Sequence, residues 1–276
     1  MSWIDSILDT LSKQPAIGYL QGGAVAAEPT AIAALALLVQ GRVEAARRAV
    51  AELAKMQGAS GAVGIRAGED APGWPTSLAI VAWSKVAAAG YAAHISRGAS
   101  WLLANRGEVI ARTPEFGHNT QLVGWAYAEQ THSWVEPTAL AVLALKAAGR
   151  SSDPAAREGV AVLLDRQLPG GGLNYGNTYV LGQLIRPHVQ PTGIALVALA
   201  GEQDSSGRLA KSAAWLRRSI GPETTPQSLA WALLGLRAQG ALPSQADEWL
   251  ANAAGQSVTN TFKLALLALA AKGWPK

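Results

Sequence analysis

The sequence predicts an all-α fold, a single (α/α)6 toroid built from six helical hairpins across residues 1–276. A turn signal of the Pro-Thr type recurs six times, and an apolar run rich in Ala and Leu follows it each time, which is typical of a repeat architecture. Clusters of β-branched and aromatic residues are few, so the repeats are expected to be helical. The signals begin at Glu28, Trp74, Glu136, Gln190, Thr225 and Thr259.

Each repeat is expected to hold two helices of different character. The first begins at the signal, where Pro suits the first turn because its missing N–H would have no partner there. This helix is apolar all round, so it should be buried on every side, and a Gly such as Gly41, Gly90 or Gly149 should end it. The second helix is amphipathic, with expected spans 43–56, 95–104, 155–166, 209–218 and 245–254.

A buried helix that alternates with a half-exposed helix is the pattern that a double ring requires, with the buried helices forming the inner barrel. All six buried helix starts should then gather at one end of a single domain. An open helical solenoid is the alternative. Three connections, at 57–74, 105–135 and 167–190, are long and contain Gly, Trp, Tyr and His, which is typical of functional loops.

Composition excludes several kinds of chemistry and suggests a location. The chain contains no Cys, which excludes disulfides, thiol catalysis and zinc held by Cys. The net charge is +4, and the basic pairs Arg47-Arg48 and Arg217-Arg218 are interpreted as solvated outer faces, with weak attraction to anionic membranes or diphosphates as the alternative. Apolar runs such as 31–39 have about half of the roughly 20 residues that span a bilayer. We expect a cytoplasmic protein with no cofactor and no nucleic-acid partner, and the sequence leaves its oligomeric state open.

Two segments carry a resemblance to a known family. Residues 225–234, Thr-Pro-Gln-Ser-Leu-Ala-Trp-Ala-Leu-Leu, resemble the start of a helix in triterpene cyclases. Residues 167–176 are similar to the Gln-and-Trp repeat motif of the same enzymes, with Leu173 where Trp is usual. The chain thus resembles the squalene-hopene cyclase and prenyltransferase β-subunit group, whose members are built on an α/α toroid. That resemblance implies an isoprenoid-handling enzyme of the terpene cyclase type.

The sequence departs from this family at the positions that carry chemistry. Class II cyclases have an Asp-x-Asp-Asp-Thr-Ala segment whose middle Asp protonates the substrate. Matching it to residues 134–139 puts Glu136 at the acid position, with Trp134 and Pro137 where flanking acids would stand. Glu28 occupies the same place in an earlier repeat. The zinc-dependent prenyltransferases and the thioester-containing relatives of the toroid both need Cys, which is absent.

Glu136, Glu28 and His132 are the candidate catalytic residues. A carboxyl group at a helix start could serve as a general acid or base, or could stabilise a cation. Its alternative role is structural, because the helix dipole and free N–H groups stabilise a carboxylate there and lower its pKa, whereas burial in an apolar cavity would raise it. His132 and His188 could join the two Glu side chains in a metal site, although loop histidines that only hydrogen-bond are the alternative and no metal is expected.

An aromatic and polar set near the same helix starts is predicted to bind a substrate. Aromatic faces suit an isoprenoid chain through their apolar area and through cation–π stabilisation of a carbocation. Loop packing is the alternative for these residues. Trp101, Trp215 and Trp249 recur in the amphipathic helices and are expected to be core residues instead. The set comprises Trp74, Trp125, Tyr127, Trp134, Asn174, Tyr175, His188 and Gln190.

The leading hypothesis is therefore acid-initiated cyclisation, or related chemistry, on a hydrophobic isoprenoid in an aromatic-lined pocket. A non-catalytic toroid that binds a hydrophobic ligand or a partner protein is the first alternative. A His/Glu metal-dependent enzyme is the second.

Overall fold

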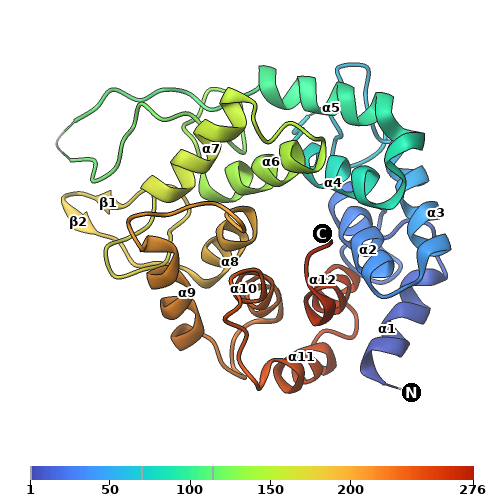
Figure 1. Ribbon diagram of the computed structural model, residues 1–276. Helices are drawn as coiled ribbons and strands as arrows, with labels where there is room; N and C mark the ends of the chain where they lie inside the picture. Colours follow the sequence, from blue (N-terminus) through green and yellow to red (C-terminus); the bar gives the residue numbers. More distant parts are fainter. Residues whose placement is uncertain (1, 70, 114) are drawn as a thin grey trace. The chain divides into compact units, whose positions relative to one another are not determined.

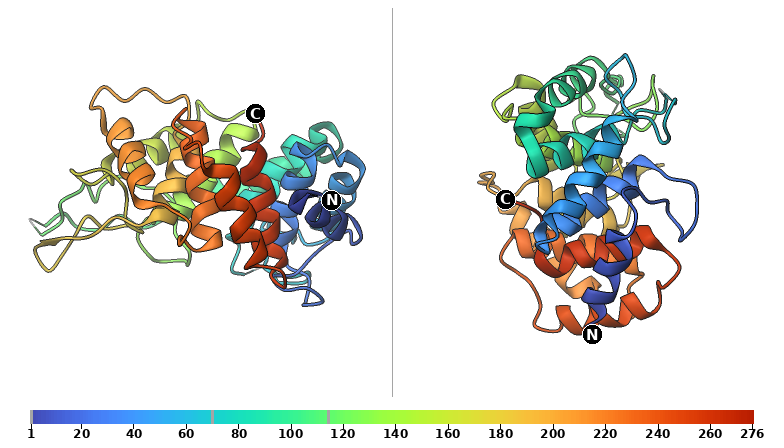
Figure 2. Two further views of the ribbon diagram at one scale, coloured as in Figure 1. Left: turned by 90° about the horizontal axis from the view of Figure 1, so that it is seen from below. Right: turned by 90° about the vertical axis from the view of Figure 1, so that its right-hand side faces the viewer.

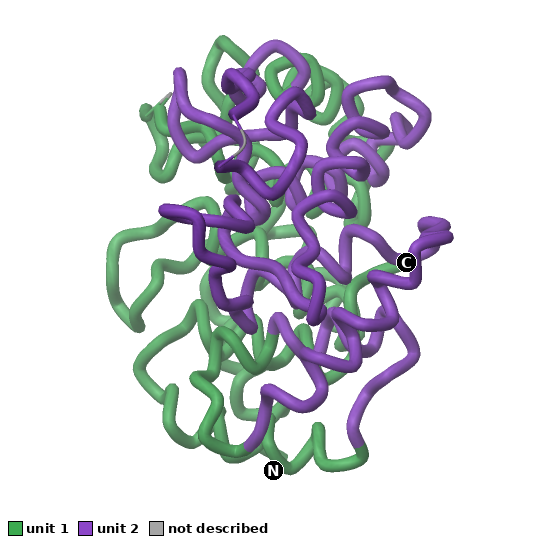
Figure 3. Tube along the Cα trace, turned by 90° about the vertical axis from the view of Figure 1, so that its left-hand side faces the viewer, with its two compact units in different colours: residues 1–102, 222–230, 244–276 green, residues 103–221, 231–243 purple. Residues whose placement is uncertain are grey.

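The computed structural model describes residues 2–69, 71–113 and 115–276 (Figure 1). The chain divides into two compact units, which are described separately (Figure 3). Unit 1 comprises residues 1–102, 222–230 and 244–276, and unit 2 comprises residues 103–221 and 231–243. Both units are mainly helical, which confirms the all-α prediction. Closure into one toroid depends on how the two units are placed, and it stays a prediction.

The buried helices begin at the six turn signals, as predicted. Their side chains are almost completely enclosed: Leu35 in unit 1 and Leu145 in unit 2 are both 0% exposed. In three of the helices the Pro is the third helical residue and not the first, so the residue before it lies inside the first turn. The buried helices are α2 (Ala27–Val39), α4 (Thr76–Ala87), α6 (Val135–Ala147), α8 (Val189–Ala198), α10 (Pro226–Ala238) and α12 (Thr261–Lys272).

The amphipathic helices also form close to their predicted spans. Their tryptophans Trp101, Trp215 and Trp249 are half-buried, so they pack against the units without reaching the core centre. The fully enclosed tryptophan is Trp83, in α4, whose ring N–H donates to the carbonyl of Val50 at 3.1 Å. The amphipathic helices are α3 (Val43–Ala54), α5 (Ala92–Ala104), α7 (Pro154–Asp165), α9 (Arg208–Ser219) and α11 (Ala246–Gly255).

An N-terminal helix, α1 (Trp3–Ser12), was not predicted. It begins with a capping box, in which the Ser2 hydroxyl accepts from the Asp5 N–H and the Asp5 carboxylate accepts from the Ser2 N–H. Its apolar face, with Ile7, Leu8 and Leu11, is buried, and the helix packs against α12 and α2 of unit 1. The Ser-x-x-Asp spacing before an apolar pattern was the sequence signal for this helix.

The expected helix stop at Gly90 is wrong. Gly41 and Gly149 do end α2 and α6 with φ of +80° and +73°, which glycine adopts without strain. At Gly90 the chain instead passes from α4 through a single turn of 3-10 helix, η1 (Ala88–Tyr91), directly into α5. The combined stretch Thr76–Ala104 is long and apolar enough to cross a bilayer by length and composition alone. Its α4 half is core of unit 1, and core helices satisfy the same criteria.

In unit 2, α8 approaches the C-terminal half of α10 very closely because two glycines face each other. A Cβ on Gly193 would lie 2.5 Å from the carbonyl carbon of Trp231, and one on Gly235 would lie 2.5 Å from the carbonyl oxygen of Gly193. No side chain fits in this contact. Gly193, at the position of Ala31 and Ala139 in the first and third repeats, is therefore explained by packing.

The Thr of the turn signal ties the preceding loop to the buried helix. In α6 the Thr138 hydroxyl accepts from the Trp125 N–H at 2.9 Å, thirteen residues upstream, and donates to the Trp125 carbonyl at 3.3 Å. The same hydroxyl bond recurs from Thr30 to Ile17, from Thr76 to Val63 and from Thr192 to Leu173. We call this hydroxyl bond the threonine latch.

The latch gives a stability prediction for Thr138, which is fully buried. Thr138→Val keeps the shape of the side chain but leaves the Trp125 N–H without its acceptor, so the free energy of unfolding should fall by about 1–3 kcal/mol. Urea denaturation measures this change. Thr138→Ser is the matched control, because it keeps the hydroxyl and loses only a methyl group. A Val variant as stable as the wild type would show that the latch does not hold the loop.

Candidate active site

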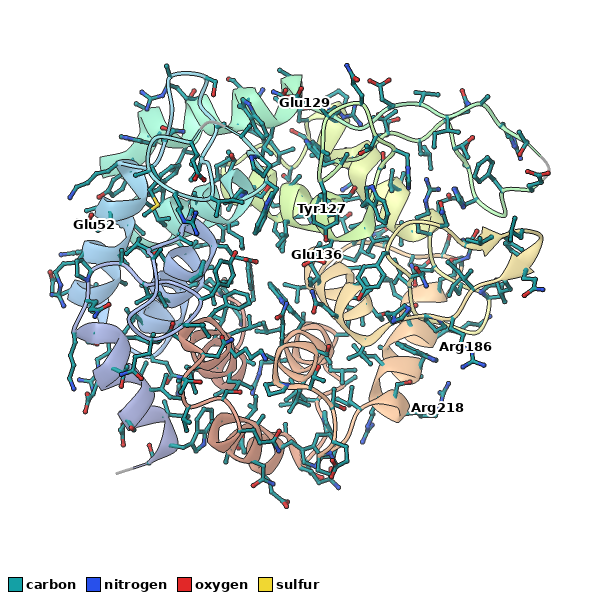
Figure 4. All side chains as sticks on the ribbon, turned by 180° about the vertical axis from the view of Figure 1, so that it is seen from behind. Glu52, Tyr127, Glu129, Glu136, Arg186 and Arg218 are labelled. Carbon is teal, nitrogen blue, oxygen red and sulfur yellow. The ribbon has the colours of Figure 1, made fainter. Side chains whose placement is uncertain are left out.

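The structure brings three of the predicted residues of unit 2 into one hydrogen-bonded group. Tyr127 donates its hydroxyl to Glu136 Oε2 at 2.6 Å, and Figure 4 shows the two side chains next to each other. The side-chain amide of Gln190 donates to both carboxylate oxygens of Glu136, at 3.2 and 3.4 Å. Both donors are neutral, so no cation compensates the charge of this carboxylate within the group. We call Tyr127, Glu136 and Gln190 the Glu136 site.

Local structure explains why these side chains meet. Glu136 and Gln190 both lie in the second helical position of their buried helices, α6 and α8, which pack against each other. Tyr127 comes from the loop before α6, two residues after Trp125, which the threonine latch holds. The N–H of Trp134 also donates to the Trp125 carbonyl at 2.9 Å, which fixes both ends of this loop segment.

Burial raises the pKa of the Glu136 carboxyl above its usual range, and the hydrogen bonds from Tyr127 and Gln190 lower it by less. The helix start favours the ionised form, and burial favours the protonated form. The sequence left this balance open, and the structure resolves it on the side of burial. A half-buried carboxyl with a raised pKa and neutral partners is suited to hold and release a proton.

Aromatic rings flank the Glu136 site on both of its loops. Tyr127 and Trp134 have ring centroids 6.1 Å apart, and His132 stacks on Trp134 at 4.7 Å. On the second loop, Tyr175 lies 5.0 Å from His188. The backbone joins the two groups, because the Val135 N–H donates to the Tyr175 carbonyl at 2.7 Å. Tyr127 and Tyr175 are each 38% exposed, so their rings are accessible to a ligand.

Other members of the predicted aromatic and polar set lie elsewhere. Trp125 is 3% exposed and packs beneath the guanidinium of Arg106, 5.3 Å from its ring, which leaves little surface for a ligand. Asn174 holds its own loop, since its amide donates to the Arg186 carbonyl at 2.5 Å and its oxygen accepts from the Tyr175 N–H at 2.7 Å. Trp74 belongs to unit 1.

Glu28 also belongs to unit 1, where it has a tyrosine partner that the sequence interpretation missed. The Tyr19 hydroxyl donates to Glu28 Oε2 at 2.6 Å, the same distance and the same nine-residue spacing as in the Tyr127–Glu136 pair. Phe262 packs edge-on against Tyr19, with centroids 5.5 Å apart. The repeated spacing Tyr-x8-Glu was the sequence signal for both pairs.

The histidines do not gather into a metal site. In the residues that the structure describes, no group of three or more His, Asp and Glu side chains could hold an ion. His132 instead lines a cavity of about 10 Å³, together with His118 and Arg166. Burial lowers the pKa of His118 to about 4 and also lowers the pKa of His132, with Arg166 adding to both effects, so these imidazoles are neutral at physiological pH. A cavity of this volume has room for about one water molecule.

Comparison with known proteins supports the fold and nothing finer. No protein-family model matches the sequence, and no curated protein sequence matches it. Solved structures do match, among them the Salmonella alpha-2-macroglobulin reacted with methylamine, with a TM-score of 0.53 and 16% identity. The similarity covers 98% of this chain but only 17% of that chain. At this identity the similarity shows a related helical fold alone, and no match supports the resemblance to squalene-hopene cyclase.

The raised pKa of Glu136 predicts a pH-dependent stability difference. Because the pKa is higher in the folded state, its contribution to stability is present below the unfolded pKa and is lost as the pH rises through the folded pKa. Glu136→Gln has no such contribution to lose. Its free energy of unfolding minus that of the wild type should therefore increase between about pH 4 and pH 8. Urea titrations across this range measure it. A difference that decreases with pH would mean that the pKa is lowered in the fold.

Proposed function

We propose that unit 2 carries the active site of an isoprenoid-handling enzyme in which Glu136 is the general acid. The observation that carries this proposal is the Glu136 carboxyl itself, with a pKa raised by burial and with two neutral hydrogen-bond donors. Accessible aromatic rings on both adjoining loops supply the apolar surface that such a substrate needs. The resemblance of residues 225–234 and 167–176 to triterpene cyclases supports the same class of chemistry.

The proposed reaction begins with proton transfer. The O–H bond of protonated Glu136 breaks as a C–H bond forms at one end of a substrate double bond, which leaves a carbocation on the substrate and a carboxylate on Glu136. Tyr127 and Gln190 donate hydrogen bonds that stabilise this carboxylate as it forms. The faces of Trp134 and Tyr175 stabilise the cation. The Glu136 carboxylate then takes back a proton, either from a carbon next to the cation, which forms a double bond, or from a water molecule whose oxygen bonds to the cation, which forms an alcohol.

A second candidate function is a non-catalytic module that binds a hydrophobic ligand. It is favoured by the Tyr19–Glu28 pair of unit 1, which repeats the distance and the sequence spacing of the Tyr127–Glu136 pair. Because the tyrosine–glutamate pair recurs in two repeats, both hydrogen bonds could serve only to hold a loop against the start of a helix. Trp134 and Pro137, where a class II cyclase carries acids, favour the same interpretation.

Glutamine substitutions distinguish the two functions. Glu136→Gln removes the proton that is transferred, so turnover of an isoprenoid substrate should fall by about 10²–10⁴-fold, the usual range for general acid–base catalysis. Product formation from polyprenyl substrates, measured by mass spectrometry, tests this. Glu28→Gln is the matched control: it removes the equivalent carboxyl from unit 1 and should leave turnover unchanged. If the wild-type protein binds an isoprenoid but converts none, the binding module replaces the enzyme.

A further inference from the structure

The loop between Tyr175 and the start of α8, the helix that carries Gln190, also carries the most exposed apolar residue among the large hydrophobic side chains of the described chain. Between them the loop forms a hairpin of β1 (Tyr179–Val180) and β2 (Gln183–Leu184), which projects from the helices of unit 2 (Figure 2). Leu181, at its tip, is 96% exposed. Val180 and Leu184 beside it are 46% and 47% exposed. These three residues form what we call the hairpin tip.

The backbone at the tip shows that folding does not require an apolar residue there. Leu181 and Gly182 are the two turn residues, with φ of +51° and +75°. Two-residue hairpins of this kind favour Asn, Asp or Gly at both positions, and a leucine at positive φ is disfavoured. Leu181 thus costs conformational energy and gains no burial in the folded protein. A contact outside the chain would account for it.

Three exposed cations lie on the segment that follows the hairpin and on α9. Pro187 and the Trp215 ring both approach Gly172, which places Arg186 next to α9, and the Gly172 N–H donates to Ser212 of that helix at 2.9 Å. Lys211 and Arg218 flank Trp215 on one helical stripe, four residues before it and three after it. Figure 4 shows Arg186 and Arg218 pointing away from the ribbon on the same side. Within the described ranges no ion pair involves Arg186, Lys211 or Arg218.

We propose that this face docks on an anionic lipid membrane, with the hairpin tip in the interfacial region and Arg186, Lys211 and Arg218 against the lipid headgroups. A membrane surface has an outer layer of anionic headgroups and an apolar layer beneath it. Interfacial segments bury their apolar residues about 5–10 Å deep, while their cations contact the headgroups. The apolar hairpin tip and the unpaired cations match these two layers. Leu181 and Arg186 are five positions apart in the sequence, a reach of at most about 17 Å in extended chain. That reach allows Leu181 and Arg186 to contact their two layers at once.

The docking proposal deepens the proposed function, because the same loop joins the tip to the Glu136 site. An isoprenoid is apolar enough to reside in a lipid bilayer. Docking through residues 179–184 would bring Tyr175 and His188, on the two arms of this loop, and Gln190, at the start of α8, close to the lipid source of the substrate. The proposal depends on the proposed function only for this consequence, and the binding itself is tested separately.

Vesicle co-sedimentation of the full chain tests the docking. We expect binding to vesicles of phosphatidylcholine and phosphatidylglycerol in equal amounts, and little binding to phosphatidylcholine alone. Leu181→Asn removes the apolar tip and suits the turn conformation, so it should fold at least as well and bind about tenfold or more weakly. Val258→Asn removes another exposed valine, 65% exposed in unit 1, and should bind like the wild type.

Substitutions of the cations test their proposed contact with the lipid headgroups. Each of Arg186→Gln and Arg218→Gln should weaken binding about fivefold, and added salt should weaken it further. Unchanged binding of Leu181→Asn, equal binding to both kinds of vesicle, or no sedimentation of the wild type would each overturn the docking proposal. Glu136→Gln should still sediment with vesicles. If vesicle binding follows these expectations while no isoprenoid is converted, the docking proposal stands and the proposed enzyme fails.

Discussion

The threonine latch is the interaction on which the rest of the structure depends. A loop of a dozen or more residues that precedes a buried helix has backbone groups that need partners, and a fully apolar helix can offer none along its sides. Its first turn can offer the hydroxyl of the Thr in the turn signal. Thr30, Thr76, Thr138 and Thr192 supply that group from inside the core, and each accepts a hydrogen bond from a loop N–H. The threonine latch therefore fixes the preceding loop at the N-terminal end of the buried helix. The residue before the Pro of the turn signal lies at the same end.

The latch also explains why a carboxylate can be buried at a helix start. In α6 the residue two positions before Thr138 is Glu136, and the latched loop brings Tyr127 over it. The loop thus shields the carboxyl from water and also supplies its partner. Shielding raises the pKa, and the neutral hydroxyl compensates only part of that effect. The helix dipole acts in the opposite direction, because it favours the ionised form at a helix start.

The repeat signal predicted the buried helices well because Pro, Thr and an unbroken apolar run act together within a few residues. It failed where the decisive interaction was not part of that pattern. Helix α1 depends on a two-residue capping box, and the continuation past Gly90 depends on packing that local propensity does not encode. For the site, the sequence placed Tyr127, Glu136 and Gln190 near helix starts, and the structure joins these three side chains by hydrogen bonds. The sequence could not separate them from Trp125, because only the fold shows that this ring lies under Arg106.

The two tyrosine–glutamate pairs lie in different repeats and have different neighbours in the sequence. Both pairs share spacing and distance, so the pair alone is a property of the repeat. Gln190, in the repeat after Glu136, occupies the position that Glu28 and Glu136 hold in the first and third repeats. A carboxylate at position 190 would set two like charges within hydrogen-bond distance, and one proton would be shared between them. The amide instead donates to Glu136 and leaves it as a single titrating group. A glutamine in the repeat position thus gives α6 one isolated, buried acid, which is the minimum that proton transfer to an apolar substrate requires.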